Sequence, residues 1–305
     1  MSSLAHATLG PNLRGDTLMA VVDERMAELI HVVPAGSEEV MEERSEPTLA
    51  AAYHLSSGGR RVRARLALSA GAALGLPTED SVAIASCVEL IHNASLIHDD
   101  LQDREGSRRG VETVHLAYGD EVAVCTGDLL LSASFAALAR FTDTGLLPEL
   151  FALVHSRIAL VIVGQCARLV STGDEERDMA KYESIAATKS GALLSLPLEL
   201  ALTGSAKGMW SAGARLAANH FAIGYQIADD LEDVEQDRGS LSVNALLVLA
   251  AAIGCSEQEA ALRARSYALA HLNKSIALAG SLPNASGGLL RELALDLSHR
   301  LEETR

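Results

Sequence analysis

ELIHNASLIHDDLQD, residues 89–103, and IGYQIADDLED, residues 223–233, each end an apolar run with the spacing DDxxD. In a helix, residues four apart share a face, so each cluster directs two or three carboxylates to one side. A helix C-terminus carries partial negative charge and disfavours carboxylates, so a cation is needed to offset the cost. Because the two clusters lie 130 positions apart, we expect them to form two walls of one metal-filled cavity.

Helical periodicity dominates the rest of the chain, and the two-residue alternation typical of strands is scarce. The composition is 49% hydrophobic but only 3% aromatic, which favours close packing of Ala- and Leu-rich helices over a β-sandwich. Helices expected at 80–101, 121–140 and 189–203 are apolar around most of their circumference and belong in the centre of a bundle. We therefore expect one all-α domain over 1–305, with about 10–13 helices around a deep apolar cavity and a disordered N-terminal segment over 1–15.

The net charge of −15 argues against nucleic acid or an anionic membrane as a partner, because both require a basic surface. Four cysteines without a CxxC pair argue against a zinc site and for reduced thiols. The N-terminus has no basic segment followed by an apolar one, and the longest apolar stretch, around 245–255, is shorter than the roughly 20 residues that span a bilayer. We expect a cytoplasmic protein without a signal peptide or a transmembrane segment.

The carboxylate clusters favour a hard, oxygen-preferring ion, Mg²⁺ or Mn²⁺, over zinc. Arginines are concentrated near the clusters and the preceding glycines, at Arg60, Arg61, Arg63, Arg65, Arg104, Arg108 and Arg109. A guanidinium group binds phosphate oxygens through paired hydrogen bonds. Carboxylates, metal and arginines together are suited to stabilising a departing diphosphate.

Each motif alone has an ordinary structural explanation: a DDxxD as a solvated helix end, an arginine run as a surface face, His92 as a core residue and Lys189 as a surface residue. Five motifs in one order are more specific. They are GGRRVRA (58–64), ELIHNASLIHDDLQDREGSRRG (89–110), TVHLAYGDEVAVCTGDLLL (113–131), ATKSGAL (187–193) and GYQIADDLED (224–233). In these motifs the chain resembles the trans-isoprenyl diphosphate synthases, in particular those that make geranylgeranyl or longer-chain diphosphates. The resemblance implies an isoprenoid-synthase-type helical bundle, generally a homodimer.

The resemblance also implies roles for individual residues. The principal ligands of three Mg²⁺ ions would be Asp99, Asp103 and Asp229, supported directly or through water by Asp100, Asp230 and Asp233. An allylic diphosphate would be bound by Arg108, Lys189, Ser190 and Gln226, and isopentenyl diphosphate by Arg60, Arg63, His92 and Arg109. The catalytic groups would be Asp99, Asp103, Lys189 and Asp229. The implied reaction is ionisation of the allylic diphosphate, attack by the isopentenyl double bond, and loss of a proton to the released diphosphate.

The chain departs from the resembled pattern at a few positions. Arg60 stands in place of lysine, Ala64 in place of proline and Ser190 in place of threonine, and these changes keep the charge, the helix and the hydroxyl group. A larger departure follows Asp233, where a lysine-bearing loop is expected and the chain reads VEQDRGSLSVN, residues 234–244. Weaker closure over the diphosphates, a partner subunit or reduced turnover would each be consistent with that difference.

Product length is expected to depend on the helix before the first cluster. Ala94, Ser95 and Ile91 would line the cavity about one to two helical turns below Asp99. In the resembled family, a bulky aromatic residue at the place of Ala94 or Ser95 stops chain growth early. Both residues are small here, so we expect a product of about twenty carbons or longer.

Two other functions compete with a chain-elongating synthase. A class I terpene cyclase would share the fold and the first aspartate cluster, but the second DDxxD and the segment with Arg60 and Arg63 argue against cyclisation. A non-catalytic, regulatory subunit of a heteromeric synthase would usually have lost aspartates. This chain keeps both sets, although the missing lysines after Asp233 favour that alternative to some degree.

Overall fold

A computed structural model of the chain describes residues 11–31, 45–167, 169–237 and 244–303. Helices dominate these residues: twelve α-helices of nine or more residues, the shorter α5 and α11, and one two-stranded hairpin. The expected all-α class and the expected number of helices are therefore confirmed. The contacts divide the chain into two compact units, one of residues 1–68 and 77–147 and the other of residues 69–76 and 148–305. Each unit is described separately, and the expectation of one domain stays a prediction.

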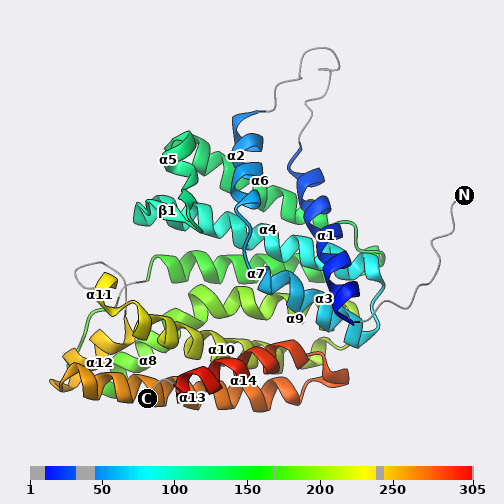
Figure 1. Cartoon of the computed structure of the whole chain (residues 1–305). Coiled ribbons are helices and arrows are strands. Elements are labelled where there is room, and N and C mark those ends of the chain that lie inside the picture. Colours follow the sequence, from blue (N-terminus) through cyan, green and yellow to red (C-terminus); the bar gives the residue numbers. More distant parts are fainter. Residues whose placement is uncertain (1–10, 32–44, 168, 238–243, 304–305) are drawn as a thin grey trace, which may run out of the picture. The chain divides into compact units, whose positions relative to one another are not determined.

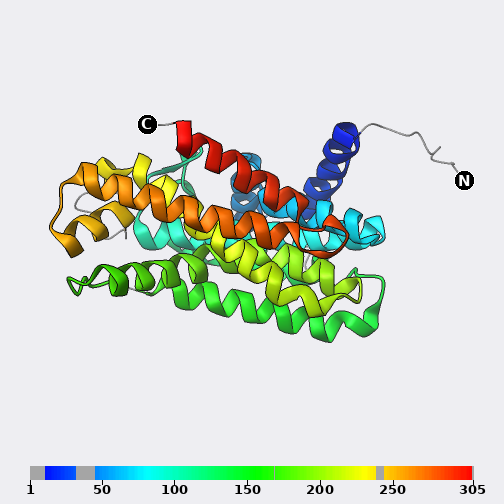
Figure 2. The same ribbon diagram turned by 90° about the horizontal axis from the view of Figure 1, so that it is seen from below.

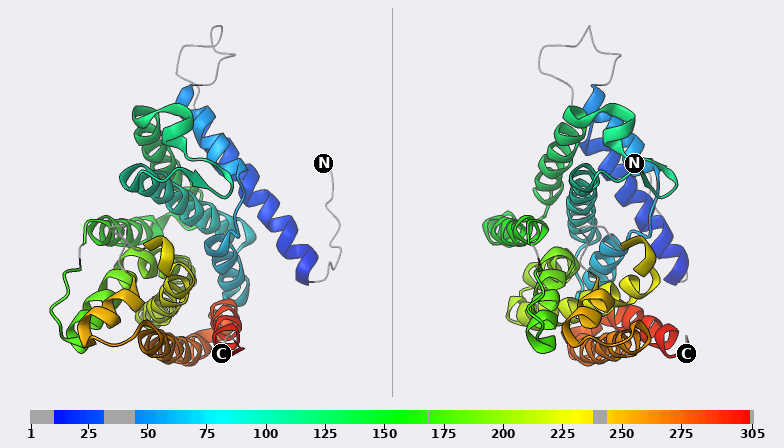
Figure 3. Two further views of the ribbon diagram at one scale, coloured as in Figure 1. Left: turned by 60° about the vertical axis from the view of Figure 1, so that its left-hand side comes forward. Right: turned by 90° about the vertical axis from the view of Figure 1, so that its left-hand side faces the viewer.

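The first unit is built around two long helices that run side by side, α4 (Thr78–Asp103) and α6 (Asp120–Leu138) (Figures 1 and 3). Two further helices pack against this pair, α1 (Pro11–Leu29) and α2 (Glu46–Ser56). The unit is completed by the first part of α3 (Val62–Leu74), by β1 (Ser107–Arg108), β2 (Val111–Glu112) and α5 (Val114–Tyr118), and by the 3-10 turn η1 (Thr144–Leu146).

Helix α4 is the core of this unit because most of its surface is apolar and buried. Glu79 and Asp80 lie in its first turn, where carboxylates interact favourably with the positive end of the helix. The helix ends at the first DDxxD cluster, and Arg104 follows in a left-handed conformation with φ 56°. The predicted position of the cluster, at a helix C-terminus, is therefore confirmed.

The second unit contains a long antiparallel set of helices, in which α13 (Glu257–Gly280) packs against α10 (Ser211–Glu232) and α14 (Gly288–Glu303) (Figure 2). Helix α10 ends at the second DDxxD cluster, as expected. The other elements of the unit are the end of α3, α7 (Leu147–Gln165), α8 (Glu175–Ala186), the π-helix η2 (Ala187–Gly191), α9 (Ala192–Gly204), η3 (Gly208–Trp210), α11 (Val234–Asp237), α12 (Ala245–Ile253) and η4 (Pro283–Ala285).

Two chain boundaries differ from expectation. Helix α1 begins at Pro11, inside the segment 1–15 that we expected to be disordered, and residues 1–10 lie outside the described residues. A proline suits the first turn of a helix, because its fixed φ is helical and its missing N–H needs no partner there. In the segment after Asp233, α11 covers Val234–Asp237, and residues 238–243 lie outside the described residues.

Four stretches of the described chain are long and apolar enough to cross a membrane by length and composition alone: α4, α6, Thr144–Gln165 and Glu175–Gly204. The expectation that no stretch meets this requirement was wrong, because it considered only uninterrupted apolar runs, and these helices include occasional charged residues. The most apolar windows of α4 and of Glu175–Gly204 are 78% and 72% buried inside the protein. These two stretches therefore serve as core helices.

Candidate active site

The three aspartates of the first cluster differ in how deeply they are buried. Asp100 is only 1% exposed, and the Nε of Arg108 donates hydrogen bonds to its two carboxylate oxygens at 2.7 and 2.9 Å. Burial opposes the charge of Arg108, but its hydrogen bonds to Asp100 raise its pKa above the ordinary value. Asp99 is half-buried and Asp103 is exposed. The residues at the two ends of the cluster, four positions apart, are thus the ones that keep solvent-accessible carboxylates.

The second cluster repeats this arrangement in the other unit. Asp230 is 3% exposed and accepts hydrogen bonds from the Tyr182 hydroxyl at 2.7 Å, the Gln226 amide at 2.9 Å and the backbone N–H of Ala245 at 2.7 Å. Asp229 is exposed, and Asp233 is half-buried. The middle aspartate of each cluster is therefore buried and bonded within its own unit, and the flanking aspartates have accessible surface.

The accessible carboxylates fit a magnesium site in which the substrate supplies some of the ligands of the ion. Within the described residues, no group of three or more His, Cys, Asp or Glu side chains is arranged to hold a metal ion by itself. Mg²⁺ commonly takes only one or two protein carboxylates and fills its remaining positions with water and phosphate oxygens. The pairs Asp99/Asp103 and Asp229/Asp233 supply carboxylates of that number and kind, so the donor sets fit the ion that the sequence predicts.

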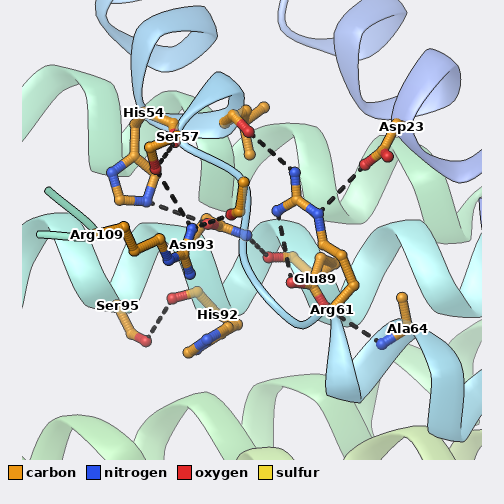
Figure 4. Close-up of polar contacts among 12 residues, drawn as sticks. Asp23, His54, Ser57, Arg61, Ala64, Glu89, His92, Asn93, Ser95 and Arg109 are labelled. Carbon is orange, nitrogen blue, oxygen red and sulfur yellow. Dashed lines mark hydrogen bonds and ion pairs between the residues drawn. The ribbon is translucent and has the colours of Figure 1, made fainter. Parts of the chain in front are cut away.

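A second group of side chains in the first unit lies around His92, and Figure 4 shows His92 and Arg109 of this group. Burial lowers the pKa of His92 well below its ordinary value, and the positive charges of Arg63 and Arg109 lower it further. Burial and the nearby charges of Arg61 and Arg108 also lower the pKa of Arg109. Like charges held this close favour an anion as their ligand. The structure thus brings together His92, Arg63 and Arg109, three of the four residues expected to bind isopentenyl diphosphate.

The hairpin explains why the adjacent Arg108 and Arg109 have different partners. Arg108 is paired in β1 with Val111, and Arg109 begins the two-residue turn with φ 54°. Its guanidinium group donates a hydrogen bond to the carbonyl oxygen of Gly58. A Cβ atom at Gly59 would lie 2.7 Å from the Arg109 Cζ atom, so a larger residue would displace the Arg109 guanidinium group from this position. Arg60 is exposed in the same segment, and its role as a ligand stays a prediction.

Lys189 and Ser190 lie in the π-helix η2, which carries the chain from α8 into α9. π-Helical turns are rare and are frequent at functional sites. The backbone approaches its neighbours closely here, since a Cβ atom at Gly191 would lie 2.4 Å from the Asn219 Oδ1 atom. Both predicted ligands are half-buried. Gln226, the third expected neighbour of the allylic diphosphate, instead donates its amide N–H to Asp230.

The three residues expected at the cavity floor also differ in environment. Ala94 and Ile91 are buried, with 0% and 2% exposure. Ser95 is half-buried, and its hydroxyl donates a hydrogen bond to the carbonyl oxygen of His92 at 2.8 Å. Of the three, Ser95 is therefore the residue whose side chain retains accessible surface on α4.

Sequence reasoning missed the residues that support these groups. Tyr182 and Asn244 fix the end of α10, because Tyr182 bonds the Asp230 carboxylate and Asn244 donates to the Asp230 carbonyl oxygen at 2.8 Å. In the first unit, Glu89 is 2% exposed. A carboxylate is rarely fully buried without a partner, so a lone glutamate within the apolar helix expected at 80–101 was the available signal for Glu89.

Comparison with known proteins agrees with the resemblance. The polyprenyl synthetase family model matches residues 46–244. The short chain isoprenyl diphosphate synthase of Methanothermobacter thermautotrophicus is 32% identical over 209 residues, which are 67% of this chain and 63% of that protein. The geranylgeranyl pyrophosphate synthase of Geoglobus acetivorans is 30% identical over 226 residues, which are 70% of this chain and 68% of that protein. The alignment with the first of these relatives thus spans less than two thirds of its length.

Solved structures share the fold at lower identity. The structure of the Geoglobus acetivorans geranylgeranyl pyrophosphate synthetase has a TM-score of 0.76 at 23% identity and covers 93% of this chain and 99% of that chain. The decaprenyl diphosphate synthase of Rhodobacter capsulatus has a TM-score of 0.77 at 22% identity, with 95% and 99% covered. These two structures support the all-α architecture.

Proposed function

The chain belongs to the polyprenyl synthetase family, and from that premise we propose that it is a magnesium-dependent prenyltransferase that condenses isopentenyl diphosphate with an allylic diphosphate. The observation that carries the proposal is the shared design of the two clusters. Each ends a long helix, buries and bonds its middle aspartate, and leaves the flanking carboxylates at the surface. Accessible carboxylates of this number and kind are what Mg²⁺ would require to bind together with a diphosphate.

When bound, Mg²⁺, or Mn²⁺ in its place, would neutralise the charge that develops on the leaving diphosphate, and three ions are proposed. Asp99, Asp103 and Asp229 would be the principal ligands. Asp100 and Asp230 would act through the groups they hold, because both carboxylates are occupied by protein donors. By fixing Arg108, Asp100 would orient that guanidinium group toward the allylic diphosphate, while Lys189 and Ser190 would bind the same group from η2.

Isopentenyl diphosphate would bind beside His92. A neutral imidazole donates one hydrogen bond, and Arg63 and Arg109 supply charge-assisted ones, which are shorter and stronger. Arg60 would add a further guanidinium group from the exposed segment. These contacts would orient the isopentenyl double bond toward the allylic carbon. Excluding water from that geometry is essential, since water would capture the allylic cation before the double bond reacts.

The two alternatives make different predictions. A class I terpene cyclase would need no isopentenyl diphosphate and has no use for the arginine group around His92, which is the observation against it. A non-catalytic subunit would bind a partner and show no turnover alone. The segment 234–244, which lacks lysine, is the feature that keeps this second alternative in consideration.

One assay separates the three functions. The purified protein is incubated with Mg²⁺, isopentenyl diphosphate and geranyl or farnesyl diphosphate, and the dephosphorylated products are separated by chromatography. We expect longer linear prenols, and we expect them to disappear when EDTA removes the metal. Cyclic hydrocarbons formed without isopentenyl diphosphate would instead identify a cyclase, and turnover only after a second protein is added would identify a subunit.

We also propose a product of about twenty carbons or longer, because the residues before the first cluster are small. Ser95→Phe is the sharper test, since Ser95 keeps accessible surface and Ala94 is fully buried. The variant should shorten the main product by at least one isoprene unit, measured by mass spectrometry of the prenols. Ala94→Phe, which places a ring in a packed position, is expected to lose stability as well. An unchanged product distribution in Ser95→Phe would show that residues other than Ser95 limit the length of the product.

A homodimer and a cytoplasmic location complete the proposal. Helix α7 exposes Leu160, Ile162 and Val163 at 37%, 60% and 67%, and exposed apolar side chains on one helix are suited to contacts with another protein. A second copy of the chain is the partner that the family resemblance favours. Sedimentation equilibrium at micromolar concentration should give twice the chain mass of 32.1 kDa.

A further inference from the structure

The four arginines that follow Gly58 and Gly59 do not share one environment. Arg60 and Arg65 are exposed, whereas the side chain of Arg61 is only 11% exposed. The backbone of Arg61 is left-handed, with φ 48°. A residue other than glycine adopts this conformation at an energetic cost and keeps it only where its surroundings enforce it. Arg61 is therefore held inward by specific contacts.

Those contacts come from three directions (Figure 4). The Nη2 atom of Arg61 donates a hydrogen bond to the Leu55 carbonyl oxygen at 3.0 Å. Its Nε atom lies 3.3 Å from the Asp23 carboxylate, and its Nη1 atom lies 3.6 Å from Oε1 of Glu89. The Asp23 side chain is 51% exposed and that of Glu89 is 2% exposed. Because solvent screens exposed charges, Glu89 is the stronger of the two counter-charges.

Glu89 also binds the start of the next helix. Its Oε2 atom accepts a hydrogen bond from the backbone N–H of Ala64 at 3.2 Å, in the first turn of α3. A carboxylate at this position satisfies an N–H group that has no partner within the helix, and it interacts favourably with the helix dipole. The resembled motif has proline where this chain has Ala64, and proline has no N–H to donate. This contact therefore depends on the departure from the motif.

A single buried carboxylate thus fixes both ends of the segment that carries the expected phosphate ligands. Arg61 comes directly after Arg60, and Ala64 comes directly after Arg63. Glu89 lies on α4, three residues before His92, so it links the arginine segment to the helix that carries the histidine. The same helix contributes Asn93, whose side-chain amide bonds His54 of α2 at 3.1 Å. Helix α2 ends directly before the segment, and its position is thereby tied to α4 as well.

We propose that Glu89 is the positioning residue of the isopentenyl diphosphate site, and that it acts through Arg61 and the N-terminus of α3 to place Arg60 and Arg63. This inference rests on the proposed function, because it presumes that those two arginines bind the diphosphate. Glu89 itself does not touch the substrate. Arg61, although part of the arginine run, is assigned here to the support of the site and not to phosphate binding.

The test measures binding of each substrate separately by isothermal titration calorimetry. Glu89→Gln removes the charge but keeps the size of the side chain, and it should raise the Kd for isopentenyl diphosphate about tenfold, the effect of losing one charge-assisted contact. The Kd for farnesyl diphosphate with Mg²⁺ should change less than about twofold, because its ligands lie elsewhere. Glu79→Gln is the matched control on the same helix. Glu79 pairs with Arg25 at 3.0 Å, but its side chain is 49% exposed, so wild-type binding is expected.

Double-variant and rescue measurements distinguish positioning from general destabilisation. Because glutamine can still accept the hydrogen bond from the Ala64 N–H, the variant Arg61→Met combined with Glu89→Gln should bind isopentenyl diphosphate no more weakly than Arg61→Met alone. Glu89→Asp keeps the charge and should recover part of the affinity. Should Glu89→Gln fail to fold, Arg61→Lys provides the same measurement. The Kd is expected to rise several-fold, because lysine lacks the planar guanidinium fork that reaches Leu55, Asp23 and Glu89 together.

Different results would contradict the positioning role of Glu89 and the proposed function. Wild-type affinity in Glu89→Gln and in Arg61→Lys, or equal weakening for both substrates, would overturn the positioning role and leave the proposed function intact. A wild-type protein that binds no isopentenyl diphosphate would overturn the proposed function, and the role of Glu89 with it.

Discussion

At the scale of single residues, burial decides which member of a motif is available for chemistry. The two DDxxD clusters are equal in sequence, yet in each the middle aspartate is the buried one, held by Arg108 in the first and by Tyr182 in the second. The sequence predicts which residues belong to the site, because residue type and spacing set the chemistry. It does not predict their partners, because these come from distant parts of the chain and depend on the packing of several helices.

His54 is a buried histidine that stays neutral in the folded protein, so we expect it to make the stability of the fold depend on pH. Burial lowers its pKa from 6.5 to about 4, and the charge of Arg109 contributes. The unfolded chain therefore binds more protons than the folded protein below pH 6.5, so His54 destabilises the fold as the pH falls from about 6.5 to 4. From pH 7 to 4.5 the contribution is about 2 kcal/mol. In His54→Gln the free energy of unfolding should fall less with acid by about that amount.

Urea denaturation followed by circular dichroism at several pH values measures this difference. His155→Gln removes an exposed histidine and serves as the control, with the acid dependence of the wild type expected. Equal acid dependence in wild type and His54→Gln would show that His54 does not carry the effect. His92 and His220, whose pKa values are also lowered by burial, would then account for the loss of stability.

At the scale of elements, sequence periodicity predicted the helices well and the connections poorly. The long helices α4 and α6 have a sustained apolar pattern, and they were expected at 80–101 and 121–140, close to where they lie. The hairpin at 107–112 was not expected, since two-residue strands show no alternation. Beyond the end of α7 at Gln165, the hydroxyl groups of Ser171 and Thr172 donate hydrogen bonds to the Asp178 carboxylate.

Helix α10 offers a matched pair of glycines that tests its packing against α13. A Cβ atom at Gly224 would lie 2.8 Å from the Leu272 Cγ atom and 3.1 Å from the Ala268 carbonyl oxygen. Backbone atoms cannot move aside cheaply, so Gly224→Ala should lower the free energy of unfolding by about 1–3 kcal/mol. A Cβ atom at Gly213 would lie 3.6 Å from the Leu282 Cδ2 atom, which is an ordinary contact distance. Gly213→Ala should therefore leave the free energy of unfolding unchanged or raise it by up to about 1 kcal/mol.

Chemical denaturation of both variants decides between packing and helix propensity. If propensity dominated, the two substitutions would shift stability in the same direction, because alanine favours a helix over glycine at both places. Opposite signs are expected. Gly224 lies two residues before Gln226 on α10, so its variant should also weaken binding at the second cluster.

At the scale of the whole molecule, the central proposal is that two distant aspartate clusters serve one reaction. They lie in different units of the chain, and their similarity is local, since it does not extend beyond the helix ends that carry them. The sequence supports a shared function because both clusters have the same spacing and the same need for a cation. The structure shows a further similarity: in each cluster the middle aspartate is buried and the flanking aspartates are accessible.

Asp99→Asn and Asp229→Asn test whether the clusters act as a unit. Each substitution keeps the shape of the side chain and removes one metal-binding charge, so each should lower kcat/KM for condensation by about 100-fold or more. Residues that act together lose their function together, and the double variant should therefore be little worse than the weaker of the single variants. Asp296→Asn, an exposed aspartate on α14, should retain wild-type activity. Steady-state kinetics with saturating Mg²⁺ provides the comparison, and unfolding curves establish that the variants are folded. If the two losses instead multiply in the double variant, the clusters contribute independently, and the proposal that they serve one reaction must be abandoned.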